Sequence, residues 1–345
     1  MRWPAGRAPA AWSIGAAVLV FAACGCTTLP TGPVRGVAPS VRGITLVDWT
    51  SNGYGTATAL TSLDALAATG ANTVTVLVTA YQADRNAAAV RSGDPRTPTP
   101  AAVQQIVSAA RARGLRVALK PHVDLDDGSW RGYIAPADAE EWFRSYRSFV
   151  LPWADLARSL GANQFVVGTE LAGTLGHEPE WRRTIAGIRA RFPGELVYAA
   201  SWDEAAKVPF WDTLDLVGVD FYFPVAHRSD AGRLEILAAW QPWLERLRLL
   251  HRQTGRDILF SEIGYRSVDG AGMTPYAFGA GAKLDLGEQA DLYWAALQAT
   301  SDQKWIRGLT WWNWPADGSG GPLDTDYTAR GKPAARELSA AWGGM

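Results

Sequence analysis

FVVGTEL, residues 165–171, is a short apolar run that stops at a glycine and is followed by a glutamate, Glu170. A short apolar run of this kind is typical of a buried strand, so it predicts a strand with a carboxylate at its end. DILFSEIGY, residues 257–265, repeats the pattern with Glu262 and a glycine two positions later. Because functional residues of α/β barrels collect at the strand ends of one face, the two stretches predict a shared site in such a fold.

The same alternation of apolar strands and helical segments continues along the chain from Val41 and predicts eight βα units with a parallel sheet. Residues 41–345 are therefore predicted to form one domain, a (β/α)8 TIM barrel, for which about 250 residues is typical. An open doubly wound sheet is the alternative, but SNGYG at 51–55 lacks the glycine-rich phosphate-binding pattern which that fold needs. The expected strands are residues 43–49, 73–79, 116–120, 164–168, 196–200, 214–219, 257–262 and 306–310.

The N-terminal segment is predicted to direct export. Two arginines precede an apolar stretch, residues 13–23, that is too short to cross a bilayer comfortably but suits a secretory signal, so residues 1–23 are assigned to it. FAAC at 21–24 is similar to a lipoprotein processing box and predicts lipidation at Cys24, with Cys26 as second choice and simple cleavage as the alternative. Proline-containing residues 24–40 are expected to form a tether. We expect an exported lipoprotein on a cell-surface or periplasmic membrane, or else a secreted protein.

The composition narrows the classes of partner and cofactor. A formal net charge of −1 gives no basic excess for nucleic acid, and we expect contact with a membrane only through a lipid anchor. Cys24 and Cys26 are the chain's two cysteines, so the predicted barrel has no disulfide framework. Three aspartates between residues 124 and 127 lack the spacing of a calcium loop. We expect no cofactor, no required metal and a monomer.

A pair of strand-end glutamates suits glycoside hydrolysis. Retaining glycosidases hold two carboxyl groups about 5 to 5.5 Å apart, one as nucleophile and one as acid/base, and inverting enzymes hold them about 6.5 to 9.5 Å apart. If the barrel forms, Glu170 and Glu262 meet across its mouth. The pair therefore predicts a glycosidase, and the sequence leaves their separation open.

Several motifs in the same order resemble glycoside hydrolase family 113, and the resemblance extends from Gly43 to about Ala335. It implies a TIM barrel, retaining hydrolysis with β-1,4-mannanase as the best-known activity, Glu170 as acid/base and Glu262 as nucleophile. Many members of the wider clan have asparagine before the acid/base, where this chain has Thr169. Thr169 is therefore a candidate for substrate binding, although a hydroxyl can bond a sugar 2-OH less extensively than an amide. The motifs are GTEL at 168–171, KPH at 120–122, DGSWRG at 127–132, DFYFP at 220–224, SEIGYRS at 261–267 and GKPA at 331–334.

Other side chains near predicted strand ends are candidates for substrate binding. Tyr222 is a candidate to donate a hydrogen bond to Glu262 and orient it, and a tyrosine wedged into the core is the alternative. Trp202 and Trp312 are each candidates for the floor under the reacting sugar, because flat aromatic rings stack on sugars. Since neighbouring strand residues point in opposite directions, only one of Trp311 and Trp312 is expected to face the cleft.

The segment after the third strand supplies further candidates. That strand is expected to stop at Pro121 and to leave His122 and Asp124 in a loop, where they would bind sugar hydroxyls. Trp130 is predicted to form a platform along the groove or else to hold its own loop in place. Asp48 and Trp49, after the first strand, are candidates of the same kind.

Two other functional classes stay open. The first is a non-catalytic barrel that binds glycan at the cell surface, although both glutamates are present. The second is an aldolase or phosphate-handling barrel, for which Lys120 is the strand-end lysine, but the glutamates would then have no role. Mannan as substrate comes from the resemblance, since glucan, xylan or a cell-envelope polymer would need the same two carboxylates.

Overall fold

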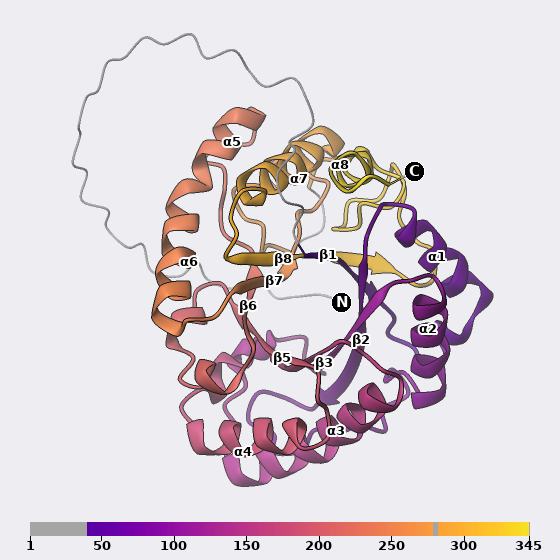
Figure 1. Cartoon of the computed structure of the whole chain (residues 1–345), viewed down its shortest axis with the longest axis vertical. Helices are drawn as coiled ribbons and strands as arrows, with labels where there is room; N and C mark the ends of the chain where they lie inside the picture. The colour runs from indigo at the N-terminus through magenta and orange to yellow at the C-terminus, as the bar shows by residue number, and fades with distance from the viewer. Residues whose placement is uncertain (1–39, 279–281, 345) are drawn as a thin grey trace.

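The computed structural model describes residues 40–278 and 282–344, in which eight strands close into a barrel in chain order, each parallel to its neighbours. Helices surround this barrel, as Figure 1 shows, so the predicted (β/α)8 architecture is confirmed. The strands are β1 (Val41–Val47), β2 (Thr73–Gln82), β3 (Arg116–Leu125), β4 (Gln164–Thr169), β5 (Glu195–Ser201), β6 (Leu216–Phe221), β7 (Ile258–Ile263) and β8 (Ile306–Pro315). The helices are α1 (Ala57–Ala67), α2 (Pro100–Ala112), α3 (Ala139–Ser159), α4 (Glu178–Arg189), α5 (Arg233–Ala239), α6 (Gln241–Thr254), α7 (Leu286–Thr300) and α8 (Pro333–Trp342).

The strands are buried on both faces, but the two faces have different neighbours. Most buried apolar side chains form one large core between the strands and the surrounding helices. A second, small cluster of four apolar residues joins side chains from four strands: Val41, Val197, Leu216 and Leu259. These four lie in the first part of their strands, whereas Glu262 lies late in β7. The strand ends are therefore where polar side chains gather.

Strand β3 is longer than the sequence predicts, because Pro121 does not end it. Strand β3 pairs with β2 as far as Leu125, but its register with β4 includes only Ala118 and Leu119. The Arg116 N–H donates to Asn72 before β2, and the next N–H, that of Val117, donates to the Asn163 side chain before β4. Because successive N–H groups point to opposite neighbours, the N–H position of residue 121 faces β4. The register between β3 and β4 ends at Leu119, so a proline at 121 removes no hydrogen bond of the sheet.

Residues 233–254 form two helices, α5 and α6, that are separated at Trp240. Helix α6 begins at Gln241 with Pro242 in its first turn, where a proline N–H is not needed for helical hydrogen bonding. Between α5 and α6, Trp240 is fully buried and its ring stacks on Phe221 of β6 at a centroid distance of 4.3 Å. The break therefore allows this tryptophan to pack on the barrel.

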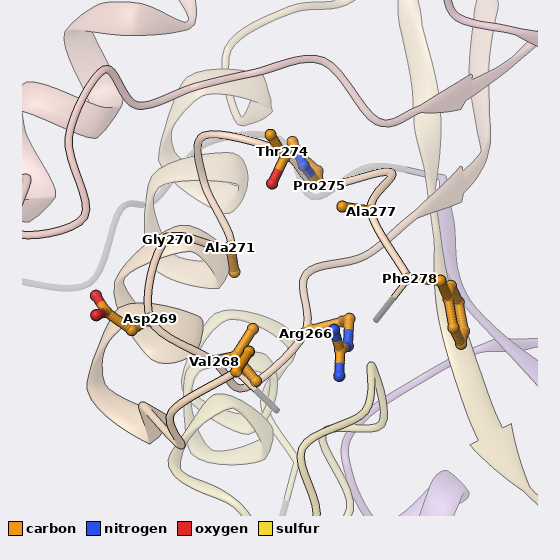
Figure 2. Close-up of a pocket in the computed structure, with 10 residues that line it drawn as sticks. Arg266, Val268, Asp269, Gly270, Ala271, Thr274, Pro275, Ala277 and Phe278 are labelled. Carbon is orange, nitrogen blue, oxygen red and sulfur yellow. The ribbon is translucent and has the colours of Figure 1, made fainter. Parts of the chain in front are cut away.

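The predicted signal segment, the lipidation site Cys24 and most of the tether lie outside the described residues. Within the described ranges, no helix combines the length and the apolar character that crossing a bilayer requires. The segment between β7 and α7 forms a pocket lined by residues from 266–278 and by Ala282 (Figure 2).

Candidate active site

Glu170 directly follows β4 and has an unusual backbone conformation. Its φ of 52° is the only positive value among the non-glycine residues of the described ranges. Such a conformation costs a residue with a side chain about 1 to 2 kcal/mol. The Glu170 N–H donates to the carbonyl of Ala199 in β5 at 2.8 Å, which holds the turn. The neighbouring strand therefore stabilises a backbone that turns this side chain towards the barrel mouth.

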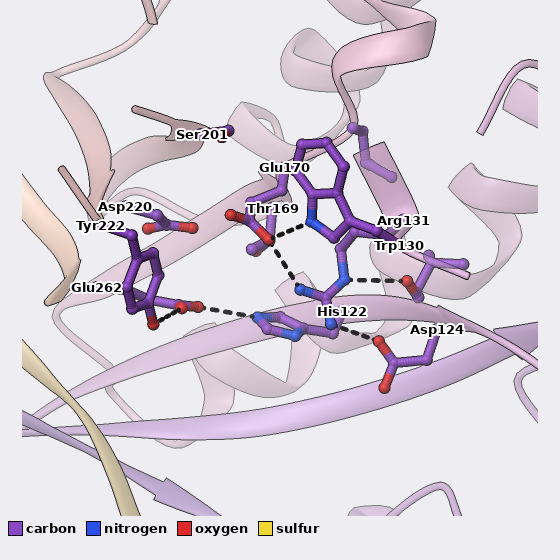
Figure 3. Close-up of polar contacts among 12 residues, drawn as sticks. His122, Asp124, Trp130, Arg131, Thr169, Glu170, Ser201, Asp220, Tyr222 and Glu262 are labelled. Carbon is purple, nitrogen blue, oxygen red and sulfur yellow. Dashed lines mark hydrogen bonds and ion pairs between the residues drawn. The ribbon is translucent and has the colours of Figure 1, made fainter. Parts of the chain in front are cut away.

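Two side chains from the segment after β3 hold the Glu170 carboxylate (Figure 3). Trp130 Nε1 and Arg131 Nη1 each donate to Glu170 Oε2 at 3.1 Å. Arg131 is itself paired with Asp124 of β3, and all three charged side chains are buried. Burial raises the pKa of Glu170, Arg131 opposes the shift, and the charge of Glu262 adds to it. A raised pKa suits a group that must carry a proton to a leaving oxygen.

Glu262 has the opposite surroundings. Lys120 Nζ of β3 lies 2.5 Å from Glu262 Oε1, and Tyr222 Oη donates to Oε2 at 2.8 Å. The tyrosine contact is the one expected from the sequence. Burial by itself would raise the pKa of Glu262, but the Lys120 charge is close enough to lower it below its usual range. Glu262 is therefore held as a carboxylate.

Asp220 of β6 completes the cluster under Glu262. Its Oδ1 lies 3.5 Å from Lys120 Nζ and accepts a 2.7 Å hydrogen bond from Ser261 Oγ. Burial, and next the charge of Glu262, raise the pKa of Asp220 well above its ordinary value. One cation thus faces two buried carboxyl groups, and the pKa directions favour the charged form of Glu262 and the protonated form of Asp220.

His122 lies on the same face of β3 as Lys120 and Asp124, because alternate strand residues share a face. Its Nε2 is 3.6 Å from Glu262 Oε1, beyond ordinary hydrogen-bond length. Burial lowers the pKa of His122 to about 4, and the charge of Arg131 contributes to this shift. The ring is therefore neutral at neutral pH and presents a polar atom beside the carboxylate of Glu262.

The two adjacent tryptophans of β8 point in opposite directions, as the sequence predicts. Trp311 is buried against α7, where its ring stacks on Tyr293 at 3.7 Å. Trp312 is only partly buried and lies parallel to the His122 ring, with centroids 5.9 Å apart and an interplanar angle of 7°. Trp312 is therefore the one that borders the cluster around Glu262.

The structure also places the other predicted residues. Thr169 Oγ1 donates to the Pro121 carbonyl at 3.3 Å. Trp202 packs against Phe223 and stacks on Tyr276 at 6.2 Å, so its ring contacts are with aromatic residues rather than with either glutamate. Asp48 accepts from the Thr50 N–H and hydroxyl in its own loop, and Trp49 is 36% exposed.

The predicted loop positions of His122 and Asp124 are wrong, since both lie in β3. The carboxylate of Asp124 is 4% exposed and paired with Arg131, so it holds Arg131 rather than lying open to sugar hydroxyls. No sequence pattern indicated a supporting role for Lys120, Asp220 or Arg131. An alternating pattern across Pro121 at residues 120–124 would have placed Lys120, His122 and Asp124 on one face.

A group of three acids in the described residues could hold a cation: Asp269, Asp285 and Glu288. The Glu288 carboxylate accepts hydrogen bonds from the N–H groups of Gly270 and Gly272, and Asp285 caps α7 by accepting from the Glu288 N–H. These three acids therefore support the loop before α7, and their contacts give no reason to propose a metal.

A family model and several solved structures are similar to this chain. The family model described as Glycoside Hydrolase Family 113 matches residues 46–332. A solved GH113 β-1,4-mannanase complex has 25% identity and a TM-score of 0.81, with 88% of this chain and 98% of that chain covered. The GH113 β-mannanase AaManA from Alicyclobacillus acidocaldarius, in complex with ManMIm, has 29% identity and a TM-score of 0.81, with 89% and 98% covered. A β-D-glucuronidase structure for Dictyoglomus thermophilum, at 15% identity and a TM-score of 0.59 with 88% and 50% covered, is similar in fold alone. A comparison with curated proteins gives no match.

Proposed function

Because this chain belongs to glycoside hydrolase family 113 and is a glycoside hydrolase, we propose that it cleaves β-1,4-linked mannan by a retaining mechanism. The observation that carries the mechanism is the contrast between its two buried glutamates. Glu262 lies against Lys120 and Tyr222, which favour its charged form, whereas burial favours the protonated form of Glu170. A nucleophile and an acid need these opposite states.

In the first step, a Glu262 carboxylate oxygen attacks the anomeric carbon and forms a bond to it while the bond to the leaving oxygen breaks. Glu170 gives its proton to that leaving oxygen, so the departing sugar ends with a hydroxyl group. The products of this step are a glycosyl ester on Glu262 and an ionised Glu170.

In the second step, Glu170 removes a proton from water while the water oxygen attacks the same anomeric carbon. The ester bond breaks and Glu262 regains its carboxylate, so two inversions give net retention. Arg131 and Trp130 stabilise the ionised form of Glu170 between the steps, because both donate to its Oε2. Asp124 positions Arg131 for this contact.

The choice of mannan rests on the two GH113 mannanase structures, whose identities to this chain are 25% and 29%. A panel of soluble β-1,4-mannan, glucan and xylan, with the anomer of the first product recorded by NMR, tests both substrate and stereochemistry. We expect mannan to be cut fastest and the first product to be the β-anomer. An α-anomer would contradict the retaining mechanism, and tight binding of mannan without product would favour the glycan-binding alternative.

Chemical rescue identifies the two glutamates separately. In Glu262→Gly, added azide should attack the side that the nucleophile has vacated and give an α-glycosyl azide from a substrate with an activated leaving group. In Glu170→Ala, azide should replace water in the second step and give the β-glycosyl azide. The reversed pattern of azide anomers would exchange the two roles.

The proposal includes the location of the enzyme. An exported, monomeric enzyme with a lipid at Cys24 would act on polysaccharide outside the cytoplasm, as the N-terminal sequence leads us to expect. Incorporation of labelled fatty acid at Cys24 tests this part.

A further inference from the structure

The pocket between β7 and α7 contains one guanidinium group, that of Arg266, four residues after Glu262 (Figure 2). The pocket is open to solvent and has a volume of about 210 Å³, less than the roughly 300 Å³ of the smallest typical ligand sites, so it suits one substituent of a larger ligand. Asp269 is the other charged residue of the lining, and Figure 2 shows its carboxylate directed away from Arg266. The rest of the lining is mainly apolar: Val268, Ala271, Pro275, Ala277, Phe278 and Ala282.

Arg266 forms no ion pair in the parts of the chain that the structure describes. Its side chain forms no hydrogen bond or ion pair there, and its Nε is buried without a partner. The guanidinium carbon lies 5.8 Å from the centroid of the Phe278 ring. Residues 279–281 are Gly, Ala and Gly and so offer no carboxylate. A buried donor without a partner is costly, and an oxyanion ligand would satisfy it.

The carboxyl groups of Asp324 and Asp326 have other partners. Asp324 pairs with Lys332 Nζ at 2.7 Å, and Asp326 Oδ1 accepts from the Tyr327 N–H at 2.8 Å. Burial raises the pKa of Asp326, and the charge of Arg266 opposes this shift. Asp326 and Arg266 form no ion pair in the described structure. The positive charge of Arg266 is therefore available to a ligand.

The backbone on both sides of Arg266 is fixed. The Tyr265 carbonyl accepts from Gln289 Nε2 of α7 at 2.8 Å, and Ser267 Oγ donates to the Asp324 carbonyl at 2.7 Å. Tyr265 and Ser267 are both fully buried. Fixing the backbone limits the positions that the Arg266 guanidinium can take, which reduces the entropy lost when a ligand binds.

The pocket borders the catalytic cluster through one aromatic residue, Tyr327. The Tyr327 hydroxyl donates to the Pro275 carbonyl at 2.6 Å, and its ring lies 5.5 Å from that of Phe278. The Tyr327 ring also lies 6.0 Å from that of Tyr222, which donates to Glu262. A group in the pocket could therefore belong to the same glycan whose reacting sugar lies at Glu262.

We propose that this pocket binds a carboxylate carried by the glycan, so that β-glycans with acidic substituents are the preferred substrates. This inference rests on the proposed function and specifies its substrate class. A guanidinium matches a carboxylate in both charge and planar geometry. A phosphate ester would bring a second negative charge, for which the lining residues supply no second cation. The Phe278 ring offers an apolar face for the sugar that bears the carboxylate.

The test compares two polymers that differ only in charge: galactomannan, and the same galactomannan after oxidation of its galactosyl C6 hydroxyls to carboxylates. For the wild type, we expect kcat/KM to be about tenfold higher on the oxidised polymer, as one charged hydrogen-bonded pair would give. Arg266→Gln should bring the two values to parity without changing the value on the neutral polymer. Arg266→Lys should give an intermediate ratio of the two kcat/KM values. Arg252→Gln, at an exposed arginine of α6, is the control: it removes the same charge as Arg266→Gln but should keep the preference for the oxidised polymer.

An unchanged ratio in Arg266→Gln, or no preference in the wild type, would overturn the inference while leaving the proposed function intact. Absence of cleavage of either polymer would instead contradict the proposed function. Calorimetric binding of the same two polymers to the wild type and Arg266→Gln would then decide the inference, since it predicts tighter binding of the oxidised polymer that is lost in the variant. Thermal unfolding of each variant shows whether a lost preference reflects a lost fold, in which case the ratio of the two kcat/KM values for Arg266→Lys is decisive.

Discussion

Replacing Lys120 by methionine should change the acid side of the pH profile more than any surface substitution. Lys120 is fully buried, and its Nζ lies 2.5 Å from Glu262 and 3.5 Å from Asp220. Methionine keeps most of the side-chain volume but removes the positive charge. Glu262 would then be a buried carboxylate beside another buried carboxyl group, so its pKa should rise.

The magnitude follows from the burial of the pair. Removing one partner of a buried ion pair costs about 3 to 5 kcal/mol, and one pKa unit corresponds to about 1.4 kcal/mol. The whole cost would correspond to about 2 to 4 pKa units, so the acid limb of kcat/KM should move up by at least about one unit even if relaxation around the ionised group offsets half of the cost. In the wild type, Glu262 has a lowered pKa, so its stabilising effect is present above pH 4.5 and is lost as the pH falls through the lowered value. In the variant, this stability at neutral pH should be missing.

The assay is kcat/KM on mannan from pH 3 to pH 9, together with urea unfolding at pH 7. A matched control is Lys207→Met, because Lys207 also pairs with a glutamate but its side chain is 67% exposed. Exposed pairs contribute little, so the control should keep the wild-type profile and stability. A folded Lys120→Met enzyme with an unmoved acid limb would refute the argument that Lys120 sets the charge of Glu262.

Three further changes test other parts of the proposal. Tyr222→Phe removes a hydrogen bond to a charged oxygen, which is worth about 1.5 to 3 kcal/mol, so kcat should fall by about tenfold or more. An unchanged kcat would show that the 2.8 Å contact to Glu262 has no catalytic effect. Glu170→Gln should lower kcat/KM much more on mannan than on an aryl glycoside with a good leaving group, and equal losses on both substrates would argue against its role as acid. In the wild type, the alkaline limb of the pH profile should lie above the ordinary glutamate pKa, because burial raises the pKa of Glu170. Cys24→Ala should abolish incorporation of labelled fatty acid and release the enzyme from membranes, whereas Cys26→Ala should change neither, and the opposite result would move the lipid to Cys26.

The sequence by itself determined the barrel and the two glutamates. Apolar runs of strand length alternate with helical stripes, and this periodicity requires no knowledge of distant contacts. Each glutamate lies at the end of its apolar run, so its place at a strand end is a local property of the chain. The family motifs, which are also local, add the expected roles of Glu170 and Glu262.

Pairing between distant segments decided the rest. The length of β3 depends on its register with β2 and on the lack of pairing with β4 beyond Leu119, and a proline at position 121 alone cannot reveal this. Lys120 and Glu262 are 142 positions apart, and they meet only because β3 and β7 close into one barrel. Charge states are set by burial and by distances of a few ångströms, since both change the energy of an ionised group. The tertiary structure therefore decided which glutamate is held ionised, which tryptophan of β8 borders the site, and which arginine lies in the neighbouring pocket without a partner among the described residues.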